Sequence, residues 1–274
     1  MRLRAAVILI LLFGAGAVCV LYAQKEFREY PGQNNIPLPA DWKEPHEWVW
    51  GRLRYTDSPY SRSGGFRRGG FSRGAWSTDY SKCDRVILSG LRRLTLVDTR
   101  SIEQVIDLDG TDDVYNWPFL YAVEVGQWSL DEKEAAQLRD FVNRGGFFMV
   151  DDFHGTPEWE IFMASLDLAF PNADVVDIPD EDPINNTVFN LNPRIQIPGQ
   201  QYVRSRDTSE RGSDGRPGHW RGIYDDKHRL IVVIVHNSDL GDAIEWADLP
   251  AYPEQFSQAA FRVLSNYVVY DLTH

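Results

Sequence analysis

The sequence predicts an α/β protein with three layers, in which a mostly parallel central sheet carries helices on both faces. Strand-length apolar runs alternate with stretches of helical periodicity through the middle of the chain. Residues 118–125 and 147–150 are apolar almost throughout, as is typical of strands that are buried on both faces. The chain has 274 residues, of which 43% are hydrophobic, and is therefore long enough to bury the core of one large domain.

Residues 1–23 predict a signal peptide or a membrane anchor. Arg2 and Arg4 precede an apolar run over residues 5–22, and Ala23 offers a cleavage site before Gln24. These features favour a cleaved signal peptide over an uncleaved anchor, and mean that any membrane contact would run through residues 5–22 alone. Either outcome predicts an exported protein.

Two further segments follow the leader. Residues 24–46 are polar and contain several prolines, which predicts an extended linker. Residues 47–274 are predicted to form one α/β domain. Its first elements are expected in this order: a strand over 47–55, a Gly- and Arg-rich segment over 61–74, a helix over 76–95, and strands over 103–108 and 118–125.

The next helix has defined ends in the sequence. Ser129 is the expected N-cap, with Glu132 completing a capping box, and Gly145-Gly146 is the expected stop. The elements predicted after it are a strand over 147–150, a helix over 159–170, a short strand over 173–176, a polar loop over 196–218, paired strands over 222–225 and 229–236, and a final helix over about 254–270.

Charge and cysteine content exclude several functions. The net charge is −12, and an acidic protein is repelled by nucleic acid at long range, so we expect no nucleic-acid partner. Cys83 is the only cysteine outside the leader, so no disulfide can form within the mature chain. No histidine lies near Cys83 in sequence, which favours a structural role over a nucleophilic one.

Several motifs together resemble a bacterial family, domain-of-unknown-function family forty-one fifty-nine. The similarity runs from Val49 to the C-terminus. It is carried by Trp117-Pro118-Phe119-Leu120-Tyr121, residues 138–152 (LRDFVNRGGFFMVDD), Phe170-Pro171, Arg229-Leu230 with His236-Asn237-Ser238-Asp239-Leu240-Gly241, and Asn266-Tyr267-Val268-Val269-Tyr270. The bacterial resemblance implies a location in the periplasm, either free or anchored to face it.

The resemblance extends to the class I glutamine amidotransferase-like superfamily, which includes the trehalose-utilisation-like proteins. It implies a related three-layer fold with a cysteine nucleophile on the turn after a strand that follows a Gly-Gly stop. In this chain that turn holds Asp151 and Asp152. The resemblance therefore implies the scaffold without the amidotransferase activity.

The acidic turn after residues 147–150 is the first candidate site. Asp151, Asp152 and His154 are expected at the carboxyl end of a central strand, where α/β proteins usually place their sites. Carboxylates and an imidazole suit a divalent metal or acid/base catalysis. Since neighbouring strand residues point to opposite faces, at most one aspartate faces the cleft. The alternative is that one aspartate caps the following helix near Thr156.

A second candidate follows the apolar strand over 229–236. His236 and Asp239 would lie at another strand end and could complete a metal cluster with Asp152 and His154. The alternative is a turn in which Asn237 and Asp239 bond to their own backbone. The metal candidates are thus Asp152, His154, His236 and Asp239, with Asp151 added as a catalytic candidate.

The Gly- and Arg-rich segment offers a weaker site. Arg67, Arg68 and Arg73, with Arg52 and Arg54, could bind an anion such as phosphate or an envelope polymer. A surface loop without a ligand is the favoured interpretation.

Two functions remain open from the sequence. One is a ligand- or partner-binding module of the cell envelope, which would bind a glycan or a protein. The other is a metal-assisted hydrolase built on the Asp/His candidates. The absence of a recognisable metal-spacing motif favours the binding module.

Overall fold

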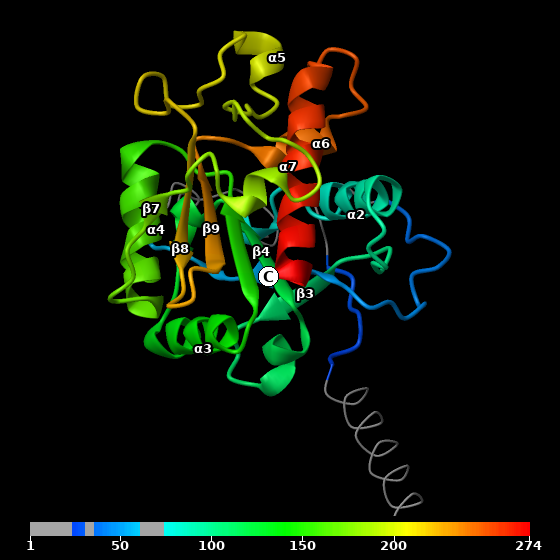
Figure 1. Ribbon diagram of the computed structural model, residues 1–274, viewed down its shortest axis with the longest axis vertical. Coiled ribbons are helices and arrows are strands. Elements are labelled where there is room, and N and C mark those ends of the chain that lie inside the picture. The colour runs from blue at the N-terminus through cyan, green and yellow to red at the C-terminus, as the bar shows by residue number, and fades with distance from the viewer. Residues whose placement is uncertain (1–23, 31–35, 61–73) are drawn as a thin grey trace, which may run out of the picture.

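A computed structural model describes residues 24–30, 36–60 and 74–274, and shows a seven-stranded sheet between two layers of helices (Figure 1). The strands follow the order β3-β1-β4-β6-β9-β8-β7. Their bounds are β1 Trp50–Arg54, β3 Gln104–Asp107, β4 Phe119–Val123, β6 Phe147–Asp151, β7 Val176–Asp177, β8 His219–Tyr224 and β9 Leu230–His236. This arrangement confirms the predicted α/β fold class.

The five strands from β3 to β9 run parallel, and β8 and β7 extend the sheet in antiparallel fashion. Tyr121 of β4 pairs with Met149 of β6, which in turn pairs with Val233 of β9. A short turn joins β8 to β9, so this pair must be antiparallel, as the sequence predicts. The carboxyl ends of the parallel strands therefore meet at one edge of the sheet, where β6 and β9 are neighbours.

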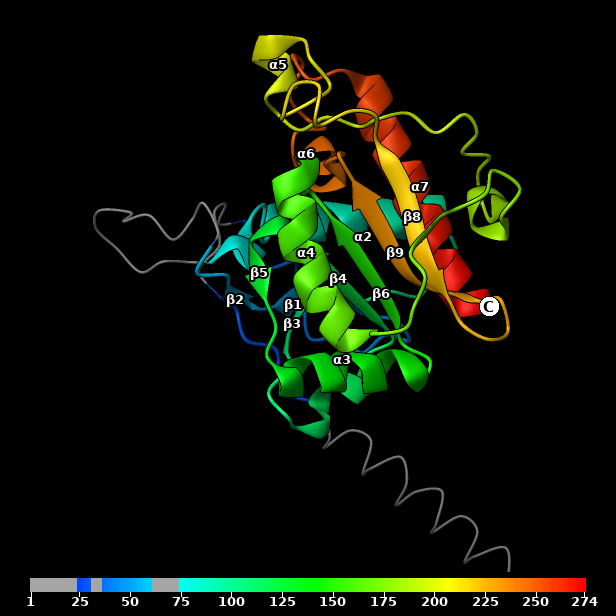
Figure 2. The ribbon, with the colours of Figure 1, turned by 90° about the vertical axis from the view of Figure 1, so that its left-hand side faces the viewer.

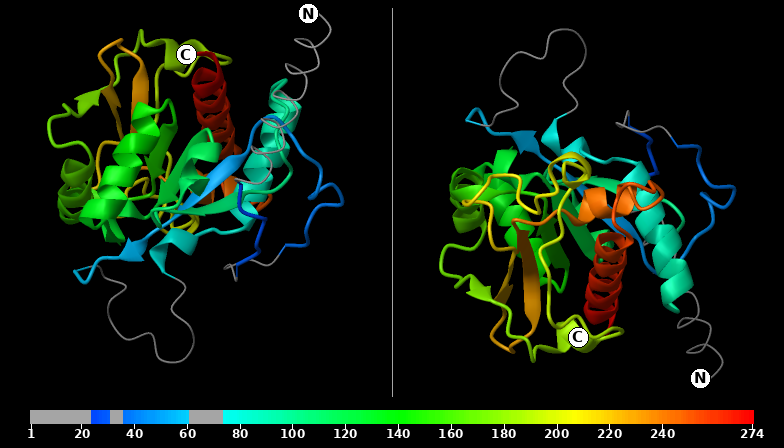
Figure 3. Two further views of the ribbon diagram at one scale, coloured as in Figure 1. Left: turned by 90° about the horizontal axis from the view of Figure 1, so that it is seen from below. Right: turned by 90° about the horizontal axis from the view of Figure 1, so that it is seen from above.

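The two faces of the sheet bury separate cores. Figures 1 and 2 show α3 and α4 over one face and α2 and α7 over the other, and Figure 3 shows the same layers from both ends. Phe148 and Val150 belong to the core under α3 and α4, whereas Phe147 and Met149 belong to the core under α2 and α7. The helices are α2 Lys82–Leu94, α3 Glu132–Asn143, α4 Gly155–Ala169, α5 Tyr202–Ser205, α6 Leu240–Glu245 and α7 Glu254–Thr273.

Three predicted helix starts are wrong. The N-cap of α3 is Asp131, whose carboxylate accepts the N–H groups of Lys133 and Glu134 while Glu134 completes the capping box. Ser129 instead belongs to β5 (Trp128–Ser129), which pairs with β2 (Thr56–Asp57) in a small second sheet.

The other two starts differ in opposite directions. A 3-10 turn, η2 (Ala75–Ser77), precedes α2, which begins only at Lys82. In contrast, α4 begins at Gly155, four residues before the expected Trp159. Both differences affect the site, because Asp79 lies between η2 and α2, and His154 directly precedes α4.

Short elements complete the described chain. Three further 3-10 turns are η3 (Asp112–Asn116), η4 (Val125–Gln127) and η5 (Pro183–Asn186). The described part of the predicted linker contacts the domain, since Lys25 Nζ lies 2.6 Å from Asp109 and Glu29 pairs with Arg85 at 3.0 Å. Among the described helices, none combines the length and apolar character that a membrane crossing requires. The predicted leader, residues 1–23, lies outside the described residues.

Candidate metal centre

The two aspartates at the end of β6 have different surroundings. Asp151 is the last residue of β6, and its Oδ2 accepts hydrogen bonds from the Tyr121 hydroxyl at 3.0 Å and from the N–H groups of Leu240 at 2.9 Å and Gly241 at 3.2 Å. Burial raises the pKa of Asp151 to about 7, and these hydrogen bonds oppose the rise. Asp151 thus ties the end of β6 to the start of α6.

Asp152 occupies the sharp turn between β6 and α4. Its φ is 58°, a left-handed backbone conformation that few residues other than glycine adopt. The side chain is buried, and its Oδ1 lies 3.2 Å from Nε2 of His154. The turn therefore directs the second carboxylate of the doublet away from the α6 amides and toward His154.

Neither aspartate of the doublet caps α4. The N–H of Gly155 donates to Oδ1 of Asn237 at 2.8 Å, and the N–H of Thr156 donates to Asp214 at 2.8 Å. Side chains from distant segments thus satisfy the free N–H groups of the first turn. The alternative prediction, that Asp151 or Asp152 is a helix cap, is wrong.

Three carboxylates from three separate segments converge at this end of the sheet. Asp79 precedes α2, Asp152 follows β6, and Asp239 is the N-cap of α6. One oxygen of each lies within 4.8 Å of the others. The three residues are only 4%, 6% and 3% exposed, respectively. We call Asp79, Asp152 and Asp239 the central triad.

Two further groups adjoin the central triad. Asp152 also lies in a group with His154 and Glu210, and Asp79 lies in a group with Asp242 and Glu245, each within the same 4.8 Å limit. We call these seven residues the acidic cluster. It contains six carboxyl groups and one imidazole. In the described part of the chain, no ion pair joins a lysine or arginine to the central triad.

Burial and mutual repulsion raise the pKa values of the central triad. Desolvation is the largest cause for Asp79, Asp152 and Asp239, and the nearest carboxylates are the next. Such a group must hold protons or bind a cation, because several buried carboxylates cannot all stay ionised unpaired. Oδ2 of Asp79 accepts no hydrogen bond and is shielded from solvent, which leaves a lone pair available for a cation.

Residues 199–218, which we call the covering segment, supply Glu210. Figures 1 and 2 show this segment, which includes α5, above the carboxyl end of the sheet, and Figure 3 (right) looks down onto it. Arg211 pairs with Glu158, and Asp214 accepts the Thr156 hydroxyl at 2.6 Å, so two contacts fix the segment to α4. The Glu210 side chain is 24% exposed, so the cluster reaches solvent on this side.

His236 lies outside the acidic cluster. Its ring packs against Phe153 and Trp159 with centroids 4.8 and 4.9 Å away, and its Nε2 lies 3.3 Å from the carbonyl oxygen of Gly155. Burial lowers the pKa of His236 to about 3, so the ring is neutral at physiological pH. Of the five sequence-predicted site residues, the structure brings together Asp152, His154 and Asp239, and separates Asp151 and His236 from them.

Four members of the acidic cluster were not predicted from the sequence: Asp79, Glu210, Asp242 and Glu245. Asp242 and Glu245 had a readable signal, because Asp239, Asp242 and Glu245 recur every three residues and so share one face of a short helix. Asp79 and Glu210 had none, since each lies in a turn or loop that tertiary packing positions.

A known family model matches the part of the sequence that contains the acidic cluster. The sequence model described as "Domain of unknown function (DUF4159)" matches residues 62–272. The chain belongs to the DUF4159 family. All members of the acidic cluster lie within the matched region of this DUF4159 chain. No curated protein matches it.

The arginines that were considered for anion binding either pair with aspartates or lie outside the described residues. Arg52 is fully buried and forms a forked pair with Asp84 through Nε at 3.0 Å and Nη2 at 2.9 Å. Arg54 forms a similar pair with Asp107 at 2.6 and 2.8 Å. Arg52 is therefore shielded from any anion in solution, Arg54 is partly exposed but paired with Asp107, and Arg67, Arg68 and Arg73 lie outside the described residues.

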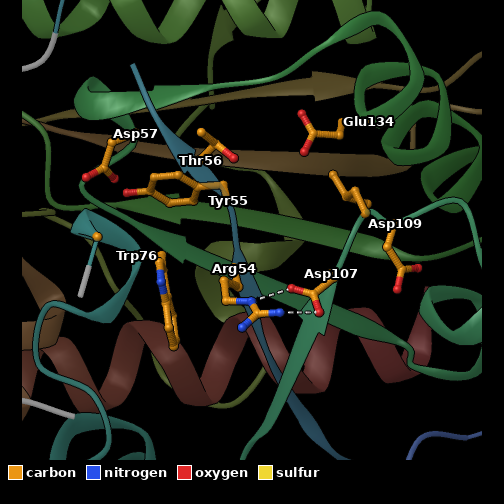
Figure 4. Close-up of a pocket in the computed structure, with 10 residues that line it drawn as sticks. Arg54, Tyr55, Thr56, Asp57, Trp76, Asp107, Asp109 and Glu134 are labelled. Atoms are coloured by element: carbon orange, nitrogen blue, oxygen red, sulfur yellow. Dashed lines mark hydrogen bonds and ion pairs between the residues drawn. The ribbon is translucent and has the colours of Figure 1, made fainter. Parts of the chain in front are cut away.

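A separate pocket of about 630 Å³ opens at the carboxyl ends of β1 and β3 (Figure 4). Its wall includes the Arg54–Asp107 pair, the rings of Tyr55 and Trp76, and the carboxylate of Glu134. The Tyr55 hydroxyl donates to the carbonyl oxygen of Val123 at 2.6 Å, next to the end of β4. The pocket thus lies at the same edge of the sheet as the acidic cluster but shares no residue with it.

Proposed function

We propose that this DUF4159 protein binds a divalent cation in the central triad and uses it to activate water for hydrolysis. One observation carries the proposal: Asp79, Asp152 and Asp239, from three different segments, converge in a buried position with no lysine or arginine paired to them among the described residues. Burying such charges costs several kcal/mol per ion unless a counter-charge is present. A divalent cation supplies that charge.

The donor set indicates the kind of cation. Carboxylate oxygens suit Mg²⁺, Ca²⁺ and Mn²⁺, whereas an imidazole suits Zn²⁺, Fe²⁺ and other transition metals. The central triad offers oxygen ligands, and His154 adds one ring nitrogen next to Asp152. Mn²⁺, which accepts both kinds of ligand, is the cation we propose.

The position of Asp152 supports the hydrolytic role. We infer an amidotransferase-like scaffold, on which a thiol nucleophile would occupy the turn after β6. Asp152 stands at that turn with its φ of 58°. A bound cation can lower the pKa of a coordinated water to about 7, and would thereby supply a nucleophile where the chain has no thiol. The partly exposed Glu210 marks the side from which water and substrate would approach.

The pocket in Figure 4 favours a second function, binding of an uncharged polyhydroxyl ligand such as an envelope glycan. Two aromatic rings and several carboxylates among the lining residues can contact the apolar face and the hydroxyls of a sugar. Together with the predicted export signal in residues 1–23, this pocket supports our placement of the protein in the cell envelope.

Metal binding by the full chain tests the main proposal. Chelator-treated protein is titrated with Mn²⁺ by isothermal calorimetry, alongside Asp152→Asn and Asp239→Asn. We expect micromolar or tighter binding by the wild type and at least a tenfold loss in each variant. Asp167→Asn, on the exposed side of α4, and His236→Gln, outside the cluster, are the matched controls and should bind as the wild type does. Equal binding by all five proteins, or no binding by any, would refute the proposal.

A further inference from the structure

With its carboxyl groups ionised, the acidic cluster holds more negative charge than one divalent cation can balance. Six carboxyl groups lie in its three overlapping sets, and the only nitrogen donor among its members is His154. One divalent cation offsets two charges, and two offset four. Because a residual charge in a buried site is costly, the composition favours a second cation over a single one.

The second position is defined by Asp79, Asp242 and Glu245. One oxygen of each lies within 4.8 Å of the others, and Asp79 and Glu245 are only 4% exposed. Asp242 and Glu245 come from α6, three residues apart, so their side chains lie on one face of this helix. Asp79 belongs both to this set and to the central triad.

Asp79 provides an independent indication of a ligand. Its Oδ2 is buried and accepts no hydrogen bond, an unusual state for a carboxylate oxygen. It lies against Gly241, where an added Cβ would come within 2.7 Å of it and within 3.6 Å of Oδ1 of Asp239. A side chain larger than glycine at position 241 would therefore collide with Oδ2, on the side shared with the central triad.

We propose that the cluster is a two-cation centre in which the Asp79 carboxylate bridges the central triad and a second site made by Asp242 and Glu245. This inference rests on the proposed function, because the first cation is the one described there. Paired cations in hydrolases lie about 3.5–4 Å apart and stabilise the attacking and the leaving oxygen together. The substrate class we assign to this centre is a phosphate ester, because in-line displacement at phosphorus uses both cations.

The experiment measures stoichiometry and magnetic coupling in the full chain. Chelator-treated protein is titrated with Mn²⁺ and followed by electron paramagnetic resonance and by equilibrium dialysis. We expect two Mn²⁺ per chain with a spin-coupled signal. Glu245→Gln and Asp242→Asn should each bind one Mn²⁺ and give an uncoupled signal, and the bound cation shows that these variants fold. Asp167→Asn should behave as the wild type.

The possible results separate the two proposals. One uncoupled Mn²⁺ per wild-type chain would overturn the two-cation centre and leave the proposed function standing. No bound Mn²⁺ would overturn both. Two uncoupled Mn²⁺, or two that persist in both α6 variants, would place the second cation away from Asp79 and so overturn the bridge.

Discussion

The Oδ2 atom of Asp151 accepts the backbone N–H of Leu240 at 2.9 Å, and this bond joins the end of β6 to the first turn of α6. Asp239, next to Leu240, is a member of the central triad, and Asp152, next to Asp151, is another. The bond therefore fixes two triad members relative to each other. The two adjacent aspartates therefore have different roles. Asp151 holds β6 to α6, and Asp152 belongs to the acidic cluster.

Asp151→Ala should destabilise the domain even when no cation is present. The substitution leaves the Tyr121 hydroxyl and the N–H groups of Leu240 and Gly241 without their acceptor in a buried place. We expect a loss of about 3–5 kcal/mol in the free energy of unfolding. Urea denaturation in the presence of a chelator measures it, and a loss below about 1 kcal/mol would show that the bond is not structural.

The two arginine–aspartate pairs should differ sharply in their contribution to stability. Asp84→Ala leaves Arg52 fully buried without its counter-charge, which should cost about 3–5 kcal/mol. Asp107→Ala breaks a pair whose side chains are 36% and 23% exposed, and should cost less than about 1 kcal/mol. Urea denaturation curves of the two variants give their free energies of unfolding. Equal losses in the two variants would contradict burial as the reason why one pair contributes more to stability.

Gly199→Ala should weaken cation binding. An added Cβ would come within 3.0 Å of carboxylate oxygens of Asp239, Asp242 and Glu210, and would push these side chains apart. We expect at least a tenfold loss of Mn²⁺ affinity by calorimetry. Gly212→Ala is the comparison variant, because it lies in the same covering segment and strains only the backbone, at a φ of 58°, while its added Cβ has no atom within 4 Å. If both variants keep wild-type affinity, the carboxylates at Gly199 do not hold the cation.

Stabilisation by the cation should grow with pH. The pKa values of Asp79, Asp152 and Asp239 are raised in the folded protein. Without a cation, the folded protein therefore binds more protons than the unfolded chain at pH values above the unfolded carboxyl pKa of about 4. Their contribution to the stability of the cation-free protein is therefore lost as pH rises from about 4 toward neutral. A cation reverses this by pairing with the ionised carboxylates.

The measurement is the difference in Tm with and without Mn²⁺ at pH 5.5 and pH 8. We expect the larger difference at pH 8. His236, whose pKa is lowered to about 3, contributes with the opposite sign, because its neutral form is favoured by folding and that stability is lost below the unfolded pKa of about 6.5. Since His236 lies outside the cluster, its effect cancels in the difference. A difference that is larger at pH 5.5 would argue against carboxylate ligands.

Sequence patterns predicted the sheet and most of its helices because burial of apolar strands is a local, periodic signal. Residues 147–150 became the centre of β6, and Gly145, with φ 106°, ends the α3 region as the Gly-Gly motif indicated. The start of α3 was misassigned because Ser129 and Asp131 are both good N-caps, and only the pairing of Ser129 with Thr56 decides between them.

The site was harder to read than the fold. Asp152 and Asp239 were accessible from sequence because each follows a buried strand, and the carboxyl ends of neighbouring parallel strands meet. Asp79 and Glu210 were not, since their positions depend on a left-handed turn before α2 and on a segment anchored by Arg211 and Glu158. His236 was predicted wrongly for a different reason. It does lie at a strand end, but its ring packs against Phe153 and Trp159, outside the acidic cluster.

Anomalous diffraction from crystals grown with Mn²⁺ locates the proposed cation. We expect an anomalous peak at the carboxyl ends of β6 and β9, with oxygens of Asp79, Asp152 and Asp239 about 2.0–2.3 Å from it. A map with no peak among these three carboxylates, at a Mn²⁺ concentration that saturates any binding in solution, would contradict it.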